Sequence, residues 1–257
     1  MSTPQDSELQ SSPFRFPDKG KNEVRGGQAI ILAGGLGTRL RSVVPYMPKC
    51  MAPVAGKPFL YFVIEHLKNQ GVDKFIFSLG YKHEMIEEWL HEQYPDLQVQ
   101  TSVEDEPLGT GGAIKLGCTL ATEKNVLILN GDTLFKINTA KLLDFHEKSG
   151  ADCTLSLKPM HNFDRYGVVE ISKDHSIASF KEKQQYEKGL INGGVYVLKK
   201  NYFLKEQLPR KFSFENDYLE KYFEKRRMYA VVQDEYFIDI GIPEDYERAQ
   251  QELKIEN

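Results

Sequence analysis

A glycine-rich segment, residues 34–40 (GGLGTRL), follows the first apolar run of the chain and has residue types that suit phosphate binding. Glycine lets the backbone approach a ligand closely and present N–H groups to an anion. Arg39, inside the segment, and Lys49, which follows Met47-Pro48, add two cations. A proline-stiffened stretch could bring Lys49 back over phosphates held by the loop. The glycines alone fit a tight turn with solvated basic residues equally well.

Two known phosphate-binding patterns do not fit this segment. A P-loop has the pattern GxxxxGK[ST], and no Lys-Ser or Lys-Thr follows the second glycine here. A dinucleotide fingerprint, GxGxxG, would have glycine in place of Leu40 and a helix that runs on. Pro45 and Pro48 interrupt the stretch that follows. The loop therefore belongs to neither class.

Two aspartates stand where a metal ion could be held. Asp132 follows the apolar run 126–130, and open α/β sheets bind ligands at the carboxyl ends of their strands. Asp239 lies in residues 237–243 (FIDIGIP). Two carboxylates, with phosphate oxygens and water, suit Mg²⁺, which takes few protein ligands. Taken singly, either aspartate also fits a helix cap or an Asx turn.

A second glycine-rich turn, residues 104–113 (EDEPLGTGGA), opens a helical pattern. A carboxylate such as Glu106 could accept hydrogen bonds from the N1–H and N2–H₂ donors of guanine, a donor pair that thymine lacks. An acidic cap at a helix N-terminus has the same composition. The turn is therefore weak evidence for a guanine nucleotide.

Composition and charge narrow the class of protein. The 257 residues are 40% hydrophobic and 27% charged, which is typical of a globular protein, and the net charge of −4 is opposite to the basic surplus of a nucleic-acid binder. No apolar run approaches the roughly 18 residues of a membrane span. The three cysteines form no CxxC pair, a pattern typical of reduced thiols. We expect a cytoplasmic protein that binds neither nucleic acid nor membrane.

The elements that must position these residues alternate between strand and helix. Strands are predicted at residues 28–33, 75–79, 99–103 and 126–130. Helices are predicted between them at 58–70, 83–94 and 111–122. This alternation predicts a mainly parallel sheet flanked by helices. After Gly150, short strands predict an antiparallel addition at 152–157, 166–171, 177–180 and 194–198, followed by a last strand at 235–240 and a helix at 243–253.

Residues 34–58 (GGLGTRLRSVVPYMPKCMAPVAGKP) resemble the signature of the nucleoside-diphosphate-sugar pyrophosphorylase family, which is GGxGTRL, then PK, then P-[VI]-x-x-[KR]-P. One departure is Cys50, where many members have proline. The resemblance extends from Gln28 to about Leu253. Further matching stretches are 130–132 (NGD), 181–183 (KEK), 192–196 (NGGVY) and 239–243 (DIGIP).

The resemblance implies a Rossmann-like, mixed but mainly parallel α/β sheet with a small antiparallel sugar-binding addition. It implies a single nucleotidyltransferase domain at 28–257. Residues 1–27 lie outside the resemblance, and their three prolines, several serines and few large apolar residues predict a flexible leader. Residues 28–150 would be the nucleotide-binding half and 151–257 the sugar-binding half. The implied reaction is the Mg²⁺-dependent transfer of a nucleoside monophosphate from its triphosphate to a sugar 1-phosphate. The sequence leaves open whether the protein forms a homo-oligomer.

The resemblance also assigns residues. The catalytic residues would be Arg39, Lys49, Asp132 and Asp239, of which Asp132 and Asp239 would hold the metal. The nucleotide would be bound by Leu32, Ala33, Gly34, Gly35, Gly37, Thr38, Arg39, Lys49, Glu106, Pro107, Gly109, Thr110, Gly131 and Asp132. The sugar phosphate would be bound by Tyr166, Gly167, Glu182, Lys183 and Asn192.

Several segments are most similar to family members that join GTP to D-glycero-α-D-manno-heptose 1-phosphate, and we expect those two substrates. These segments are 108–115, 162–167, 190–194, 211–215 and 236–241. One alternative is a nucleotidyltransferase for mannose 1-phosphate or another hexose 1-phosphate. An alternative from another class is a non-catalytic regulatory protein that binds a sugar nucleotide, although such a protein could lose the metal carboxylates that this chain keeps.

Overall fold

The computed structural model describes residues 27–35, 37, 40 and 43–255. The predicted leader, residues 1–27, lies outside this part of the chain except for Gly27, which begins strand β1 (Gly27–Leu32). Thr38 and Arg39, both predicted site residues, also lie outside the described residues.

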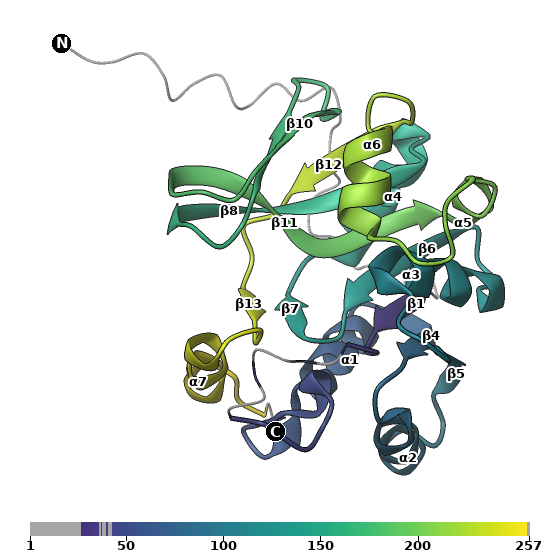
Figure 1. The fold of residues 1–257 in the computed structure, drawn as a ribbon, viewed down its shortest axis with the longest axis vertical. Coiled ribbons are helices and arrows are strands. Elements are labelled where there is room, and N and C mark those ends of the chain that lie inside the picture. The colour runs from purple at the N-terminus through teal and green to yellow at the C-terminus, as the bar shows by residue number, and fades with distance from the viewer. Residues whose placement is uncertain (1–26, 36, 38–39, 41–42, 256–257) are drawn as a thin grey trace.

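The first half of the chain forms the predicted parallel sheet (Figure 1). Strands β6, β1, β4 and β5 lie side by side in that order, and each neighbouring pair is parallel. The strands after β1 and the helices that link them are α1 (Phe59–Asn69), β4 (Val72–Leu79), α2 (His83–Gln93), β5 (Gln98–Val103), α3 (Gly109–Leu120) and β6 (Asn125–Asn130).

The second half extends the same sheet with antiparallel strands. The long strand β11 (Tyr186–Lys199) pairs antiparallel with β6 and so joins the two halves. It also pairs with β8 (Cys153–Phe163) and β9 (Val168–Ile171), while β10 (Ile177–Lys181) pairs with β9. Strand β12 (Met228–Val232), which the sequence pattern did not predict, runs parallel to β8. The predicted fold class is confirmed.

Two short strands stand apart from this sheet. Strand β7 (Thr133–Phe135) pairs antiparallel with β13 (Phe237–Asp239), so the predicted strand at 235–240 joins a separate two-stranded ribbon. The other elements are η2 (Lys49–Met51), β2 (Pro53–Val54), β3 (Lys57–Pro58), α4 (Thr139–Ser149), α5 (Lys200–Phe203), the π-helical segment η3 (Phe214–Leu219), α6 (Glu220–Tyr222) and α7 (Pro243–Glu252).

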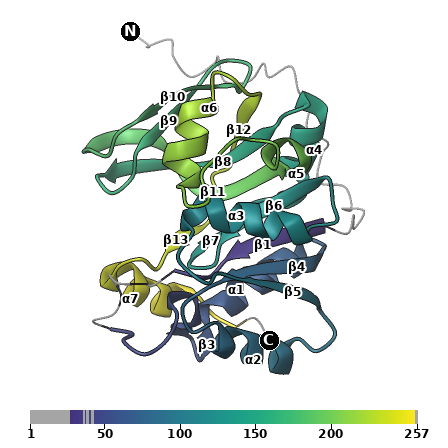
Figure 2. The same cartoon turned by 45° about the vertical axis from the view of Figure 1, so that its right-hand side comes forward.

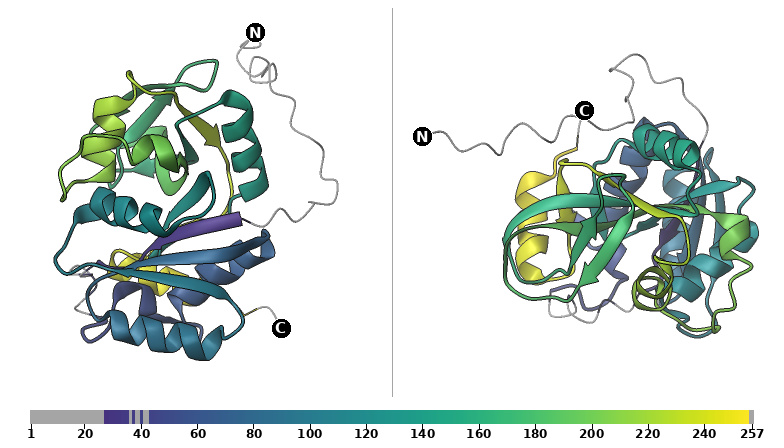
Figure 3. Two further views of the ribbon diagram at one scale, coloured as in Figure 1. Left: turned by 90° about the vertical axis from the view of Figure 1, so that its right-hand side faces the viewer. Right: turned by 90° about the horizontal axis from the view of Figure 1, so that it is seen from above.

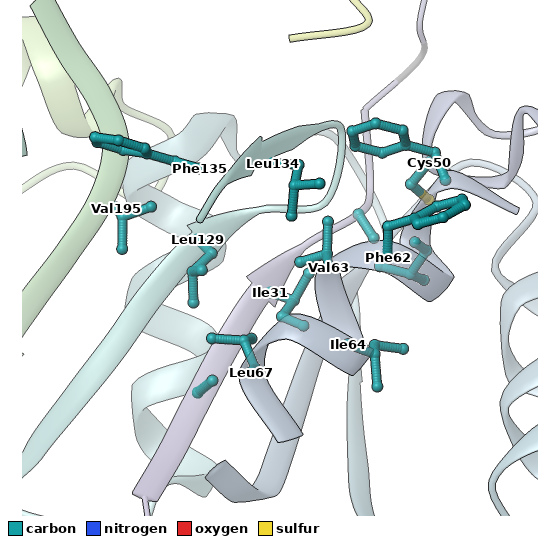
Figure 4. Packing of buried hydrophobic residues seen from close by; sticks show 14 of the residues in the cluster. Ile31, Cys50, Phe62, Val63, Ile64, Leu67, Leu129, Leu134, Phe135 and Val195 are labelled. Carbon is teal, nitrogen blue, oxygen red and sulfur yellow. The ribbon is translucent and has the colours of Figure 1, made fainter. Parts of the chain in front are cut away.

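The apolar core lies on both faces of the central strands. Ile30 and Ile31 are both fully buried, and they belong to separate clusters because successive strand residues point to opposite faces. Ile31 faces α1, where Val63 and Leu67 pack (Figure 4). Ile30 packs in the cluster that contains Ile114 of α3. Burial on both faces explains the continuous apolar run of β1.

The helices therefore cover the parallel sheet from two sides (Figure 2). Figure 3 shows the fold from two further directions, with the strands of the second half, in green, away from helices α1 and α2, in blue. The three cysteines are free and buried. None of the described helices is both long and apolar enough to cross a membrane.

Candidate active site

The candidate site lies where the chain changes direction across the sheet. From β1 the chain continues to β4 and β5 on one side, and it then returns to β6 on the other side of β1. The loops that leave β1 and β6 therefore diverge at their carboxyl ends, which is where open α/β sheets bind ligands. Hydrogen bonds join these strand ends: Gly131 N–H donates to Leu32 O (2.8 Å) and Ala33 N–H donates to Ser78 O (2.8 Å).

A cavity of about 180 Å³ opens at this point. Within the described part of the chain it is lined by Leu32, Ala33, Gly35, Gly37, Lys49, Cys50, Asp132 and Gly241. All of these except Cys50 and Gly241 were assigned to the site by the sequence. The cavity thus collects residues of the glycine-rich segment, the Pro48-Lys49 stretch and both aspartate-bearing segments.

Lys49 lies between the two aspartates. Its Nζ donates to Asp132 Oδ2 (2.7 Å) and to Asp239 Oδ1 (3.2 Å). The Lys49 side chain is 12% exposed, whereas those of Asp132 and Asp239 are 34% and 21% exposed. Burial by itself would lower the pKa of Lys49, but the two carboxylates outweigh it and leave that pKa above its ordinary value. The ammonium group of this cavity-lining residue is therefore held charged.

The β7–β13 ribbon brings the two aspartates together. Asp132 directly precedes β7, and Asp239 is the last residue of β13, where it pairs with Thr133. Ile240 N–H donates to Asp132 O (3.1 Å), which ties the two chain segments beside the carboxylates. The position of Asp239 depends on this pairing between distant segments, which explains why local patterning could not predict the contact.

The backbone of Lys49 is placed by the glycine-rich segment. Gly37 has φ of +57°, and a Cβ on it would lie 3.0 Å from the Lys49 Cβ. A side chain at this position would be strained and crowded, so glycine is required for the close approach. Lys49 itself begins η2 directly after Pro48.

Helix α7 supports the site from outside. Tyr246 OH donates to Pro53 O (2.6 Å), and Gln250 Oε1 accepts from Ala55 N–H (3.2 Å), so α7 holds the β2–β3 hairpin that follows Lys49. Asp245, at the start of α7, forms ion pairs with Arg165 and Arg248. One helix thus contacts both the Lys49 side and the Tyr166 loop of the site.

The side chains near the cavity include two carboxylates that could bind a metal ion. No group of three or more His, Cys, Asp or Glu side chains comes together among the described residues. Two carboxylates do converge on one cationic group, Lys49 Nζ. Mg²⁺ is typically bound through one or two carboxylates plus substrate phosphates and water. Asp132 and Asp239 therefore fit such an ion when phosphate and water complete its ligands.

The second glycine-rich turn leads into α3 and is held by the segment before η3. Gly109 has φ of +73°, and Gly111 N–H donates to Phe212 O (3.0 Å). Glu106 and Pro107 are exposed, and Glu106 Oε1 lies 3.1 Å from Arg210 Nη1. The Thr110 hydroxyl donates to Glu215 Oε2 (2.8 Å). The side chains of Glu106 and Thr110 thus contact the 210–215 segment.

Glu104 is a residue of this turn that the sequence interpretation passed over. Its Oε2 accepts from Leu108 N–H (2.9 Å), and its own N–H donates to Leu79 O (2.9 Å) at the end of β4. Burial raises the pKa of the Glu104 carboxyl. Its position directly after β5 parallels that of the site residues after β1 and β6, and this signal was available in the sequence.

The predicted sugar-side residues lie in the antiparallel half. Tyr166 packs edge-on against Phe237 (6.1 Å between ring centroids), two residues before Asp239, and burial together with Asp239 raises the pKa of its phenol to about 12. Gly167 lies against Lys181 O, where a Cβ would come within 2.4 Å. Glu182 and Lys183 are exposed in the turn between β10 and β11. Asn192 Nδ2 donates to Tyr196 OH (2.8 Å).

Comparison with known proteins shows extensive similarity. The family described as "Nucleotidyl transferase" matches residues 28–256. A D-glycero-alpha-D-manno-heptose 1-phosphate guanylyltransferase from Aneurinibacillus thermoaerophilus is 52% identical over 227 residues, which are 88% of this chain and 98% of that protein. One of the same name from Campylobacter jejuni is 47% identical over 220 residues, 85% of this chain and 96% of that protein.

A solved structure is similar across the same range. The crystal structure of HddC from Yersinia pseudotuberculosis complexed with GMP-PN has a TM-score of 0.80 and 40% sequence identity. The match covers 89% of this chain and 100% of HddC.

Proposed function

The chain belongs to the nucleotidyl transferase family, and from this premise we propose that it condenses GTP with D-glycero-α-D-manno-heptose 1-phosphate to give GDP-heptose and pyrophosphate. The observation that carries the proposal is the Lys49–Asp132–Asp239 cluster at the carboxyl ends of the sheet strands. The two heptose 1-phosphate guanylyltransferases, at 52% and 47% identity, support the choice of sugar. HddC, crystallised with GMP-PN, supports a guanine nucleotide.

The proposed reaction needs no general base, because the sugar 1-phosphate is already an anionic nucleophile. One of its oxygens would attack the α-phosphorus of GTP in line, and the bond between that phosphorus and the oxygen bridging to the β-phosphate would break. Pyrophosphate carries away the electron pair. The work of the protein is then positioning and charge neutralisation.

The cationic residues would neutralise the phosphates. Lys49, a charged and largely buried residue that lines the cavity, is proposed to bind the α-phosphate region. Arg39, which lies outside the described residues, is proposed to stabilise the β- and γ-phosphates as charge develops on them. The backbone of Gly34, Gly35 and Gly37 would line the phosphate-binding surface.

Members of this family generally use a divalent metal ion, and we propose Mg²⁺ for this chain, held by Asp132 and Asp239. When bound, it would screen the negative charge of the triphosphate and the incoming phosphate. The same carboxylate oxygens bind Lys49 Nζ in the structure. Lys49 would therefore exchange a carboxylate for phosphate oxygens when nucleotide and cation enter together.

The guanine base is proposed to bind at the turn before α3. The sequence indicates that Glu106, together with Pro107, Gly109 and Thr110, binds the base. The Glu106 carboxylate, however, is exposed and faces Arg210. Glu104 is half-buried and uses Oε2 to hold the turn through Leu108 N–H. Its Oε1 is left to accept from the N1–H and N2–H₂ donors of guanine. We propose Glu104 as the base-reading carboxylate.

The sugar 1-phosphate is proposed to bind across the antiparallel half, with contacts from Tyr166, Gly167 and Asn192. Glu182 and Lys183, on an exposed turn, would contribute to the sugar hydroxyls and the phosphate. Residues 28–150 and 151–257 are proposed as the two halves of one domain, which is supported by the pairing of β11 with β6. We also propose that the protein works in the cytoplasm, which agrees with its three free cysteines.

A substrate panel tests the proposal. Pyrophosphate release would be measured for each of the four nucleoside triphosphates combined with heptose, mannose or glucose 1-phosphate. We expect GTP with the heptose 1-phosphate to give the highest kcat/KM. A higher value with mannose 1-phosphate would assign a different sugar, and no turnover with any pair would indicate a non-catalytic binding protein.

A further inference from the structure

The Glu215 carboxylate contacts both halves of the proposed site. Its Oε2 accepts from Thr110 Oγ1 (2.8 Å), at the start of α3 on the nucleotide side, and from Ser213 Oγ (3.2 Å). Its Oε1 lies 3.4 Å from the hydroxyl of Tyr196, on β11. One side chain, with its two oxygens turned in different directions, therefore joins α3 to β11.

The Tyr196 hydroxyl also hydrogen-bonds to Asn192 and so links Glu215 to that residue. Tyr196 is 2% exposed, and its hydroxyl oxygen accepts from Asn192 Nδ2 (2.8 Å). A hydroxyl has one proton to donate, and Glu215 Oε1 is its acceptor. Asn192 Oδ1 in turn accepts from Gly194 N–H (3.1 Å). The amide is thereby fixed in one orientation, with one N–H and one lone pair left for a ligand.

The backbone around Asn192 is shaped for this contact. Between Asn192 and Tyr196 the pairing of β11 with β8 shifts register, so the strand bulges there. Bulges near sites re-aim side chains. Gly194, inside the bulge, has φ of +70°, and its Cβ would lie 2.8 Å from Asn130 Nδ2. The bulge thus packs against the end of β6, two residues before Asp132.

Glu215 is itself held on a fixed segment. It lies in the π-helical segment η3, and π-helical turns are frequent at functional sites. Phe214 N–H donates to Thr110 Oγ1 (2.8 Å), and Asn216 N–H donates to Ser213 Oγ (3.1 Å). The Phe214 ring packs edge-on against Tyr196 (5.0 Å between centroids). Glu215 therefore has little freedom to move away from its two partners.

We propose that Glu215 is a positioning residue for the sugar 1-phosphate, acting through Tyr196 on the amide of Asn192 and anchored on the nucleotide side by Thr110. This inference rests on the proposed function, because Asn192 is the residue assigned to face the sugar. The shared carboxylate fixes the sugar-facing amide relative to the turn that would hold the base. The two substrates are then aligned by one hydrogen-bonded chain, and alignment of two reactants is a large part of catalysis in this type of transfer.

Glu215→Gln isolates the Tyr196 arm. The glutamine oxygen can still accept from Thr110 and Ser213, which both donate to Oε2, while its NH₂ faces the Tyr196 hydroxyl and leaves that hydroxyl without an acceptor. Tyr196→Phe removes the hydroxyl itself, and with it both the bond to Glu215 Oε1 and the acceptor of Asn192 Nδ2. We expect each variant to raise KM for the sugar 1-phosphate about tenfold, the effect of losing roughly one hydrogen bond. KM for GTP should stay within about twofold of the wild-type value, since the Thr110 contact is kept.

The double variant Glu215→Gln/Tyr196→Phe decides the question. If the two residues act through one hydrogen-bonded chain, the double variant has the same KM for the sugar 1-phosphate as each single variant, about tenfold above wild type. Two independent contacts would instead raise this KM roughly hundredfold. Asp217→Asn is the matched control, since Asp217 lies in the same segment but accepts from Ser213 N–H and pairs with Lys221. It should leave both KM values unchanged.

Three outcomes would overturn the inference: an additive double variant, a Glu215→Gln enzyme with lowered thermal stability but unchanged KM, or an Asp217→Asn enzyme with the same kinetic defect. The proposed function is judged separately, on the wild-type enzyme. If the wild-type enzyme prefers another pair of substrates, the proposed substrates are wrong, and the comparison of single and double variants is made with the preferred pair. If it turns over no pair at all, both proposals fail.

Discussion

Lys49 and Asp132 form an ion pair of 2.7 Å across the carboxyl ends of the sheet, and the same ammonium group reaches Asp239 at 3.2 Å. Three residues that are far apart in the chain thus share one charge centre. The two carboxylates would repel each other without a cation between them. The Lys49 ammonium group offsets this repulsion beside the cavity, where a divalent ion and phosphate oxygens would replace the internal contacts.

Lys49→Ala should lower turnover by about 10²-fold or more, because a charge contact to the reacting phosphates typically contributes about 3 kcal/mol. Pyrophosphate release at saturating substrates measures this loss. Lys57→Ala is the control, since Lys57 is a cation of the same signature that hydrogen-bonds to Gln93 at an exposed position. Near-normal turnover of Lys49→Ala, with the fold intact by thermal unfolding, would contradict the role of Lys49.

Chelation of divalent cations should abolish turnover, and added Mg²⁺ should restore it. Asp239→Asn should raise the Mg²⁺ concentration for half-maximal rate at least about tenfold, since one charged ligand is lost while the asparagine oxygen still accepts from Gly241 N–H. Asp234→Asn, which changes an exposed acid paired with Lys158, should leave the Mg²⁺ dependence unchanged. A fully active enzyme in excess chelator would exclude the proposed metal.

Glu104→Gln should lower kcat/KM for GTP by roughly 10- to 100-fold, which is the cost of one hydrogen bond to a charged group. Glu106→Gln is the matched variant, because the two acids lie in one turn and Glu106 faces Arg210. We expect it to stay within about twofold of the wild-type enzyme. The reverse order of the two effects would return the base-reading role to Glu106.

Two histidines, His146, which is buried, and His66, which is half-buried, should make the fold acid-sensitive. Burial lowers the pKa of His146 to about 4, and nearby cations such as Lys199 add to the shift. His146 Nε2 also lacks a hydrogen-bond partner among the described residues. His66 has a similarly lowered pKa of about 4, again chiefly through burial. Both side chains are neutral in the folded protein at neutral pH.

Whether the unfolding free energy rises or falls with pH depends on which state, folded or unfolded, binds the proton. Between about pH 6.5 and 4 the unfolded chain protonates these histidines and the folded protein does not, so the unfolding free energy falls as the pH falls. For His146 alone we expect a loss on the order of 2 to 3 kcal/mol between pH 7 and 4.5. Urea unfolding at the two pH values measures it. His146→Asn, which can still pair with Thr154, should show a smaller loss, and an equal loss would show that His146 does not contribute.

The parallel half of the fold could be read from the sequence because its strands have a simple environment. Ile30 and Ile31 are buried on opposite faces, so β1 is a continuous apolar run that ends at a glycine loop. The same holds for β6, which ends at Asn130. Local pattern and burial agree in these strands, and the residues that follow them could be assigned to the site.

Other features depend on contacts between distant segments. β7 is only three residues long, and its pairing with β13 places Asp239. The residue pattern of β7 is too short to predict that pairing. The choice between Glu104 and Glu106 depends on how the turn closes at Gly109, which has φ of +73°. The contact of Tyr196 with Glu215 joins a strand to a π-helical segment. Each required knowledge of tertiary structure.

Helix α7 makes the phosphate-binding end of the fold depend on contacts between segments that are far apart in the chain. Its Tyr246 hydroxyl donates to Pro53 O, and Gln250 Oε1 accepts from Ala55 N–H, so a helix near residue 250 secures a hairpin near residue 55. Asp239 also arrives only after the rest of the sheet has been made. A nascent chain can therefore form the parallel strands early, yet it has neither the second carboxylate nor the buttress of the β2–β3 hairpin. The phosphate-binding end of the protein becomes complete only after β13 and α7 have joined the segments that precede them in the chain.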